Sequence, residues 1–455
     1  MRLILAIFIC KSARLFLRLL GRGGTNLPGK LALKCYPNIL GQLGKQVSTT
    51  VITGTNGKTT SARMLEEAYQ VAGIHAFSNR SGANLLPGIT AEFIQNATFF
   101  GKMRKKHAII ECDEGAFRHA ATYLNANMIL VTNVFRDQLD RFGEISNTVA
   151  HIRAGIVQSP NATICINADC PLLVSMVQDL TQEICYFGAE DIALAQNAEP
   201  TMIEAAHCHD CHAALTYNYK TYGHLGNYFC SACAFVRPNT DVTFLKLLSS
   251  DTDTSTVLFA FGENQQEFRI NLPGVYNVYN ALGIATVCYK LGIDLSAITK
   301  ALAEFQGGFG RMEVMHIGNA VARMVLVKNP VGATQAFGYL SKVEEPFHLA
   351  ICLNDRSGDG TDISWLWEIE TEAICGIQDK LDRVFCGGTR ANDLPAWLKQ
   401  AGVADEKIQV FSDMDSLLAE IAQAEIPVFI MPTYTAMLEM RRKLEKKYGL
   451  KRFWK

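Results

Sequence analysis

Short apolar runs alternate with helical patterns along the chain from Val47 onward. Between the runs, segments such as Thr59–Ala72 and Glu144–Gln158 place apolar residues at helical spacing. This alternation predicts an α/β fold with a mostly parallel sheet covered by helices on both faces. The runs expected to form buried strands are Val47–Thr53, His107–Asp113, Asn127–Asn133, Ala162–Asp169 and Glu183–Gly188.

The last third of the chain repeats the strand–helix rhythm. A final helical pattern at Tyr434–Tyr448 closes it. These features predict a second, smaller Rossmann-like domain. Its expected strands are Met324–Lys328, His348–Leu353, Arg383–Cys386, Ile408–Phe411 and Val428–Met431.

The N-terminal stretch Met1–Leu20 is apolar but is interrupted by Lys11, Arg14 and Arg18. Its longest apolar run, Leu3–Cys10, is too short to span a bilayer. The pattern predicts an amphipathic helix, which either lies on a membrane surface or packs on the protein. Both placements stay open at this point.

Charge is distributed unevenly over the 455 residues, although the net charge is only −1. No Asp or Glu precedes Glu66, and the tail Arg441–Lys455 is rich in Lys and Arg. Basic ends favour contact with an anionic surface or ligand, or they are solvated helix faces. The near-zero total argues against a nucleic-acid-binding protein.

Residues 53–60, Thr-Gly-Thr-Asn-Gly-Lys-Thr-Thr, follow an apolar strand and open a helix. Glycines let backbone N–H groups approach a phosphate, and the helix N-terminus favours an anion. Lys58 would neutralise the outer phosphates, and the Thr59 hydroxyl would bind Mg²⁺. The residues expected to bind the nucleotide here are Gly54, Thr55, Asn56, Gly57, Lys58, Thr59 and Thr60.

Only two residues separate Gly54 from Gly57, and this short loop resembles that of the Mur ligases and folylpolyglutamate synthetases. Further segments match the family in order: 110–114 with Glu111, 132–134 with the following Asp137–Gly143, 274–277 with Asn280, and 310–313 with Arg311. The resemblance implies that Glu111 binds Mg²⁺ and acts with Lys58 in catalysis. It also implies that Asn277, Asn280 and Arg311 contact ATP, with Lys328 and Asn329 as further contacts.

The chain departs from the family at two places. Asp137-Gln138 stands where many members have an Asp-His pair, so a second Mg²⁺ site is open. No lysine occurs between Lys106 and Lys220, so the carbamoylated lysine of many members has no evident counterpart.

Two Cys-x₂-Cys pairs, Cys208 with Cys211 and Cys230 with Cys233, have the spacing of a zinc ribbon. Four thiolates saturate Zn²⁺, so a structural site is expected. The other ten of the fourteen cysteines are scattered singly, as reduced core cysteines are, which favours a cytoplasmic protein, with the inner face of the membrane as a further option. We predict a basic N-terminal segment at 1–45, an ATP-binding domain at 46–315 with the ribbon inserted at 205–236, and the Rossmann-like domain at 316–455.

A Mur-type ATPase with a four-cysteine ribbon resembles the ligase subunits of the lipid II isoglutaminyl synthases. The resemblance implies ATP-dependent amidation of the D-glutamate α-carboxyl of lipid II in peptidoglycan synthesis. Ammonia would come from a GatD-type glutaminase partner, whose catalytic residues an Asp of this chain completes. We expect Asp355 in that role, with Asp359 and Asp362 as reserves; all three lie in a loop that otherwise reads as a solvated turn with helix caps.

Two other function classes stay open. The nearest is a stand-alone Mur-type or folylpolyglutamate-type ligase that adds an amino acid in place of ammonia. The other is a zinc-ribbon NTPase acting on nucleic acid, which only the ribbon supports.

Overall fold

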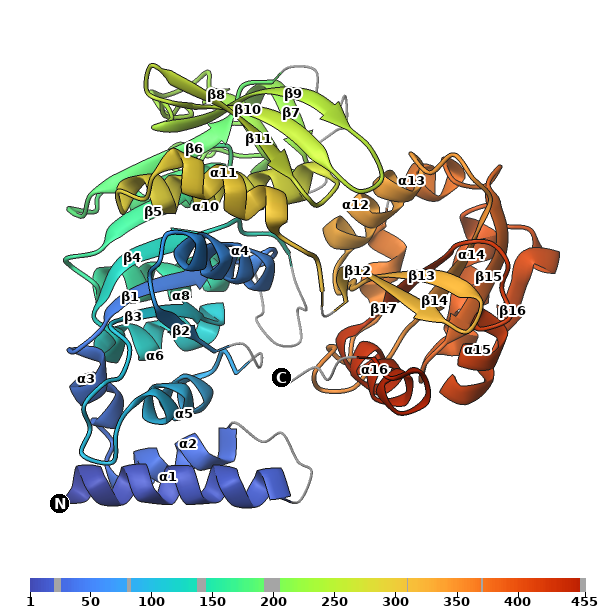
Figure 1. Cartoon of the computed structure of the whole chain (residues 1–455). Helices are drawn as coiled ribbons and strands as arrows, with labels where there is room; N and C mark the ends of the chain where they lie inside the picture. Colours follow the sequence, from blue (N-terminus) through green and yellow to red (C-terminus); the bar gives the residue numbers. More distant parts are fainter. Residues whose placement is uncertain are drawn as a thin grey trace.

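Two α/β units, each a sheet with its covering helices, lie side by side, with the N-terminal helices below the first of them (Figure 1). The computed structural model describes residues 1–19, 26–79, 83–136, 145–191, 205–308, 310–369 and 371–450.

The first unit is built on a nine-stranded sheet of order β11-β10-β9-β6-β5-β4-β1-β3-β2. The neighbours from β9 to β2 pair in parallel, and only β10 and β11 are antiparallel. The strands are β1 Ser48–Thr53, β2 Ala76–Ser78, β3 His107–Glu111, β4 Ala126–Val131, β5 Thr163–Asn167, β6 Ile184–Ala189, β9 Val242–Ser250, β10 Ser255–Phe261 and β11 Asn264–Ile270. The mostly parallel sheet is confirmed, and the five expected strands lie within two residues of those observed.

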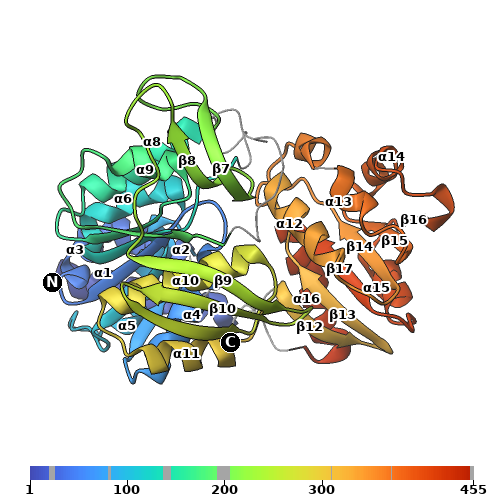
Figure 2. The ribbon, with the colours of Figure 1, turned by 90° about the horizontal axis from the view of Figure 1, so that it is seen from above.

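Helices cover both faces of this sheet, with α4, α10 and α11 on one side and α6, α8 and α9 on the other (Figure 2). Their bounds are α4 Lys58–Val71, α6 Glu114–Leu124, α8 Ile145–Val157, α9 Pro171–Val177, α10 Val275–Lys290 and α11 Leu295–Glu304. Asp113 caps α6 by accepting from the N–H groups of Gly115 and Ala116, which fixes where that helix begins after β3. The carboxyl ends of β1 and β3 therefore lead into helix N-termini at one edge of the sheet.

The N-terminal helices form a separate group around α5. They are α1 Arg2–Leu19, α2 Asn26–Cys35, α3 Ile39–Gly44 and α5 Leu86–Asn96. α1 packs on α2 and α5 through the buried side chains of Ala6, Ile7 and Cys10. The amphipathic helix expected at Met1–Leu20 is thus present, and no helix in the described ranges has the length and apolarity to cross a bilayer.

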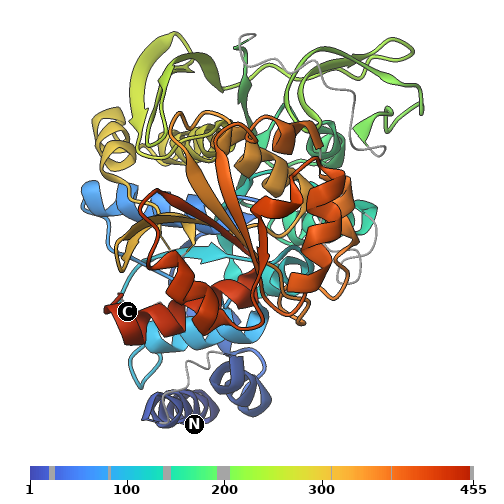
Figure 3. The same ribbon diagram turned by 90° about the vertical axis from the view of Figure 1, so that its right-hand side faces the viewer.

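The second unit is built on a six-stranded sheet of order β12-β13-β17-β14-β15-β16, seen behind its covering helices in Figure 3. Its strands are β12 Arg311–Ile317, β13 Ala320–Val325, β14 Phe347–Cys352, β15 Leu381–Gly387, β16 Ile408–Val410 and β17 Val428–Pro432. Its helices are α12 Pro330–Leu340, α13 Thr371–Cys375, α14 Leu394–Gln400, α15 Met414–Ile421 and α16 Tyr434–Tyr448, with short 3₁₀ turns η3 Ser364–Glu368, η4 Ala391–Asp393 and η5 Asp405–Lys407.

The strand expected at Met324–Lys328 is wrong in its bounds. It runs instead over Ala320–Val325, because Asn329 accepts from the N–H of Gly332 and caps α12, so residues 326–329 form the connection. The segment that follows the loop of Asp355, Asp359 and Asp362 is a 3₁₀ turn, Ser364–Glu368.

Candidate active site and cysteine cluster

The loop between β1 and α4 adopts a conformation that depends on its two glycines. Gly54 has φ +116° and Gly57 has φ +85°, backbone geometry that disfavours residues with a Cβ. A Cβ at Gly57 would also lie 2.0 Å from Oδ1 of Asn280. Glycine is therefore required at Gly57 both by the backbone angle and by the close approach of α10.

The segment after β4 holds this loop in place. Asn133 accepts from the Asn56 N–H at 2.9 Å through its side chain and from the Thr55 N–H at 2.9 Å through its carbonyl. The Thr132 hydroxyl donates to the Asn56 carbonyl at 2.7 Å. Thr55 in turn donates to the carbonyl of Phe135 and accepts from its N–H. The loop is thus preorganised without a ligand contact.

Lys58 begins α4 and is buried beside carboxylates. Its Nζ donates to Glu114 Oε1 at 2.9 Å and to the Gly54 carbonyl at 2.5 Å. Burial alone would lower the pKa of Lys58, but Glu114, with smaller contributions from Asp113 and Glu111, outweighs it and raises the pKa. The ammonium therefore stays charged at the position where a helix N-terminus already favours phosphate.

Thr59 and Glu111 come together at the carboxyl end of β3. The Thr59 hydroxyl donates to Glu111 Oε2 at 2.8 Å, and Glu111 is 7% exposed. Asn79 orients the backbone of Glu111 by accepting from its N–H and donating to its carbonyl. A hydroxyl and a carboxylate are the hard oxygen ligands that Mg²⁺ prefers, so this pair fits a magnesium site.

Asn277 and Asn280 lie on the first turns of α10, facing the loop. The Asn277 amide donates to the Pro273 carbonyl at 2.7 Å, which fixes the start of the helix, and Asn280 contacts Gly57. Arg311 begins β12 at the opposite wall, where burial lowers its pKa and the Glu111 carboxylate opposes that shift. The structure thus gathers the phosphate loop, both asparagines and Arg311 around one space.

That space is a cavity of about 960 Å³. It is lined by residues 55–60, Glu111, Asn277, Asn280, Arg311, Lys328 and Asn329, and it continues to Arg14 and Glu92 near the N-terminal helices. Asn329 donates from Nδ2 to Asn56 Oδ1 at 3.0 Å, which links the second sheet to the phosphate loop. The volume is sufficient for a nucleotide together with part of a second substrate.

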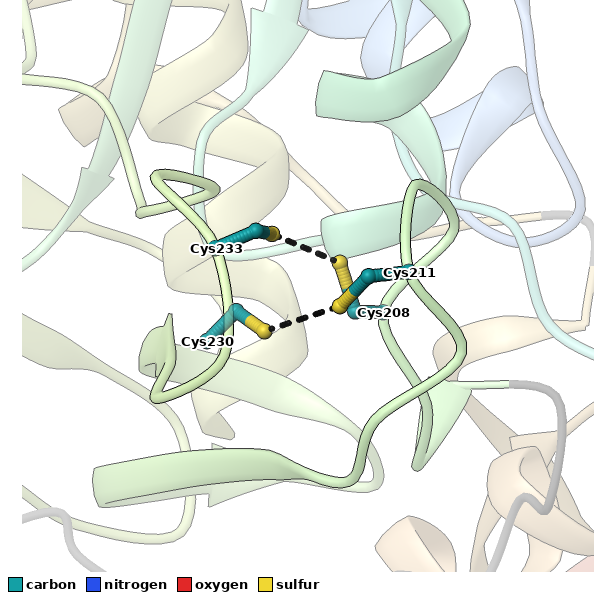
Figure 4. Close-up of side chains that lie close together, drawn as sticks. All are labelled: Cys208, Cys211, Cys230 and Cys233. Carbon is teal, nitrogen blue, oxygen red and sulfur yellow. Dashed lines mark hydrogen bonds between the residues drawn. The ribbon is translucent and has the colours of Figure 1, made fainter.

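The four cysteines of the paired motif converge, as Figure 4 shows. Their sulfurs lie within 4.8 Å of one another, with Cys208 and Cys233 at 3.5 Å and Cys211 and Cys230 at 3.4 Å. A Zn–S distance of about 2.3 Å implies sulfurs about 3.8 Å apart in a tetrahedron, so the cluster fits that metal. The neighbouring His207, His209 and His212 are not part of the cluster.

The cysteines stand at one end of a hairpin, β7 Leu215–Tyr222 and β8 Leu225–Cys230, whose other end reaches the cavity. There Tyr222 lines the cavity and lies 5.6 Å, ring to ring, from Phe135. Arg237 follows the hairpin and donates to the fully buried Asp169 at 2.6 Å. The ribbon is therefore packed against the same Phe135 that holds Thr55.

Asp355 lies in the loop after β14, away from the cavity lining. Its carboxylate accepts from the Thr389 hydroxyl at 2.9 Å and pairs with Arg390 at 3.2 Å; the Thr389 hydrogen bond is the larger cause of its lowered pKa. Asp359 is buried and accepts from the N–H and hydroxyl of Thr435, and Asp362 accepts from the N–H of Ser364. The two reserves are thus engaged in local structure, whereas Asp355 is held in place with its side chain 31% exposed.

Some functional residues were not singled out from the sequence. Glu114 was quoted only as part of its motif, and its pairing with Lys58 follows from the fold alone. Tyr222 carries no sequence signal, since its role depends on how the ribbon packs. The Asp137-Gln138 pair lies outside the described residues.

Comparison with protein families gives two matches. The family model for the Mur ligase middle domain matches residues 52–234, and the model for the MurT ligase C-terminal domain matches residues 326–437.

Two curated relatives match over nearly their full length. The lipid II isoglutaminyl synthase (glutamine-hydrolyzing) subunit MurT of Streptococcus pneumoniae (strain ATCC BAA-255 / R6) is 36% identical over 95% of this chain and 95% of that protein. The subunit of the same name from Staphylococcus aureus (strain COL) is 32% identical over 97% of this chain and 98% of that protein.

Solved structures agree on the fold. A MurF crystal structure from Acinetobacter baumannii has a TM-score of 0.66 at 16% identity, covering 92% of this chain and 80% of that one. A pseudomurein peptide ligase type C from Methanothermus fervidus has a TM-score of 0.64 at 18% identity, covering 89% and 79%. The Mur ligase-like α/β architecture expected from the sequence is thereby confirmed.

Proposed function

Because the chain belongs to the MurT family of lipid II isoglutaminyl synthase subunits, we propose that it activates a carboxylate with ATP and transfers ammonia to it in peptidoglycan synthesis. The substrate carboxylate is the α-carboxyl of D-glutamate in the lipid II stem peptide, and the product is D-isoglutamine. Supporting this proposal is a phosphate loop that opens, with Glu111 and Arg311, onto one large cavity.

The reaction has two balanced steps. The carboxylate oxygen attacks the γ-phosphorus of ATP, and the bond from that phosphorus to the β-phosphate oxygen breaks. The products of this step are an acyl phosphate and ADP. Ammonia then attacks the acyl carbon, phosphate departs, and the surplus proton passes to solvent. Catalysis of phosphoryl transfer is mainly positioning and electrostatic stabilisation.

The residues around the cavity suit those demands. The N–H groups of residues 55–60 and the Lys58 ammonium would bind the phosphates, and Arg311 on the opposite wall would face the transferring group. Thr59 and Glu111 would hold Mg²⁺, a cofactor of Mur ligases, which supplies charge neutralisation when bound. Asn277 and Asn280 would orient the loop and the nucleotide. The four thiolates would hold Zn²⁺ as a structural ion.

The name shared by the relatives describes a subunit of a glutamine-hydrolysing enzyme, so a partner subunit is part of the proposal. We propose a GatD-type glutaminase that releases ammonia, with Asp355 orienting the partner's catalytic histidine. The exposed edge of Asp355, fixed by Thr389 and Arg390, supports this choice over Asp359 and Asp362.

The test is an amidation assay on lipid II that follows ADP release and the mass of the stem peptide. With glutamine and the partner subunit, or with ammonium chloride alone, we expect one ADP per D-isoglutamine formed. Turnover with a free amino acid and no partner would instead support the stand-alone ligase and contradict this proposal.

A further inference from the structure

Helix α1 presents two opposite apolar faces. One is buried against α2 and α5, as Ala6, Ile7 and Cys10 show. Successive residues of a helix are rotated by about 100° around its axis. By this rule the exposed large apolar side chains of α1 lie on the opposite side, in a single stripe roughly 120° wide. They are Ile4, Leu5, Phe8, Leu15, Phe16 and Leu19.

This second face is substantially exposed. Phe8 is 57% exposed, Phe16 61% and Leu19 79%. α1 lies at the outer edge of the molecule (Figure 1), and no described element covers this side of it. A continuous apolar stripe of this size on a soluble surface marks an interaction site.

A second segment extends the stripe. The loop 97–106 lies beside α1, because Lys11 Nζ donates to the Ala97 carbonyl at 2.5 Å and stands 4.9 Å from the centre of the Phe99 ring. Phe99 is 49% exposed and the adjacent Phe100 is 82% exposed. Two distant parts of the sequence thus present exposed aromatic side chains on one surface.

The charges around these side chains are of one sign. Exposed basic residues lie on α1, on α2 and in the loop: Arg2, Arg18, Lys30, Lys34, Lys102, Arg104, Lys105 and Lys106. No Asp or Glu precedes Glu66 in the sequence, and Glu92 on α5 is neutralised by Arg14 at 3.1 Å. Because α1, α2 and the loop 97–106 contain basic residues and no Asp or Glu, the apolar stripe and its surroundings are complementary to an anionic, partly apolar surface.

We propose that this N-terminal face, formed by the exposed stripe of α1 and the loop 97–106, docks the protein on a bilayer of anionic phospholipids. The apolar side chains insert at the level of the acyl boundary, and the Lys and Arg side chains bind lipid phosphates. The helix lies in the plane of the interface and does not cross it.

The docked orientation connects to the proposed function, on which this step rests. The active-site cavity extends from the phosphate loop to Arg14 and Glu92, at the inner side of α1. A lipid-linked substrate whose head group enters the cavity there would keep its prenyl chain in the bilayer that α1 contacts. Docking then raises the local concentration of substrate at the cavity mouth.

The test is flotation with vesicles of equal parts phosphatidylglycerol and phosphatidylcholine, compared with phosphatidylcholine alone. We expect the full chain to bind the anionic vesicles, more weakly at high salt, and the double variant F8E/F16E to lose at least about tenfold in partition coefficient. The double variant L248E/V314E is the matched control, since Leu248 and Val314 are exposed apolar residues outside this face. Equal thermal melting of all three proteins excludes misfolding.

Vesicle binding by F8E/F16E equal to the parent chain, or no binding by the parent, would overturn the proposal. The proposal would also be overturned if the parent chain did not bind vesicles and F8E/F16E changed the mass of its assembly in solution, either with itself or with the partner subunit. The face would then be a protein interface. A water-soluble, short-prenyl lipid II analogue separates the two proposals. F8E/F16E should amidate it at the parent rate, whereas failure of the parent on it would contradict the proposed function and leave the vesicle result standing.

Discussion

Lys58 has hydrogen-bond partners within the protein, and these shape what nucleotide binding must achieve. Its ammonium is shared among Glu114 and the carbonyls of Gly54 and Thr55. A phosphate that enters the loop has to compete with a buried carboxylate for the same cation. In the function proposed above, nucleotide binding would therefore exchange Glu114 for phosphate as the anionic partner of Lys58, with little change in the charge of that residue.

The first residue-scale prediction concerns Lys58→Met. We expect about tenfold to a hundredfold weaker ATP binding, because a charge-assisted contact to phosphate is lost. Calorimetric titration with a non-hydrolysable ATP analogue measures it. Lys246→Met, at an exposed lysine of β9, is the control and should bind as the parent does. Unchanged affinity in Lys58→Met would remove Lys58 from the proposed site.

The second prediction at this scale concerns Asp355→Asn. Ligation with ammonium chloride should be unchanged, and the glutamine-driven rate should fall by about a hundredfold or more, because the amide no longer supports a histidine cation. Since the Thr389 hydrogen bond lowers the Asp355 pKa below its usual 3.8, the carboxylate stays ionised on acidification to pH 6. Asp362→Asn is the matched control. Retention of the full glutamine-driven rate in Asp355→Asn would move the role to another residue.

At the scale of elements, the phosphate loop depends on how closely α10 approaches it. Gly57→Ala should weaken nucleotide binding by at least about tenfold and lower the melting temperature, because the new Cβ meets Asn280 as well as a strained φ. Gly73→Ala is a matched control, since Gly73 also has a positive φ, +73°, but no atom within 4 Å of the added Cβ. It should show only the smaller loss of about 1–2 kcal/mol from the backbone. Equal effects of the two substitutions on ATP binding would contradict the role given to α10.

The ribbon and the phosphate loop both contact Phe135, so we expect the two to be coupled. Removing metal with a chelator, or by Cys230→Ser, should loosen the hairpin, expose Tyr222 and weaken ATP binding by a few-fold. Tyrosine fluorescence and calorimetry follow the two effects separately. Cys375→Ser, at an exposed cysteine outside the cluster, should change neither. A hairpin that melts while ATP affinity stays constant would show the two sites to be independent.

The sequence predicted best those elements whose local chemistry determines them. The β1–loop–α4 unit and α16 were found within one residue, since strand, glycines and helical spacing follow one another. The strands β9, β10 and β11 were not predicted. β11 begins with the polar and largely exposed residues Asn264–Glu267, which carry no strand signal, whereas the apolar run Val257–Phe261 of β10 was a signal that the sequence analysis missed. The pairing of Lys58 with Glu114 depends on β3 lying beside β1, which no local pattern reveals.

At the scale of the whole molecule, residues from both sheets and their connections line the cavity. Asn329, which begins α12 beside the second sheet, donates a hydrogen bond to Asn56 in the phosphate loop of the first. The Asn329→Ser variant keeps a side chain able to cap α12 but removes the amide that donates to Asn56. We expect ATP affinity to fall about threefold to tenfold with little change in melting temperature. Ser364→Ala, at the 3₁₀ turn of the same domain, is the control. Unaltered affinity in Asn329→Ser would mean that the cross-domain hydrogen bond does not tune the loop.

The domain boundary predicted at residues 315 and 316 falls inside β12, a strand that pairs with β13 in the second sheet. The prediction placed the boundary after the motif at 310–313, whereas Arg311 of that motif already begins a strand of the second sheet. Arg311, which lines the cavity, therefore belongs to the second sheet. Any rotation of the second sheet moves Arg311 with it.

The place of the ribbon in the chain has one more consequence. It occupies the connection between β6 and β9, which pair in parallel, and parallel neighbours require a crossover that is usually a helix. Here the crossover contains the β7–β8 hairpin and four clustered cysteines, whose geometry fits a structural zinc ion. The strands β9 to β11 and the helix α10 follow it in the chain, so we propose that zinc binding at the cluster governs how readily the second half of the large sheet assembles during synthesis.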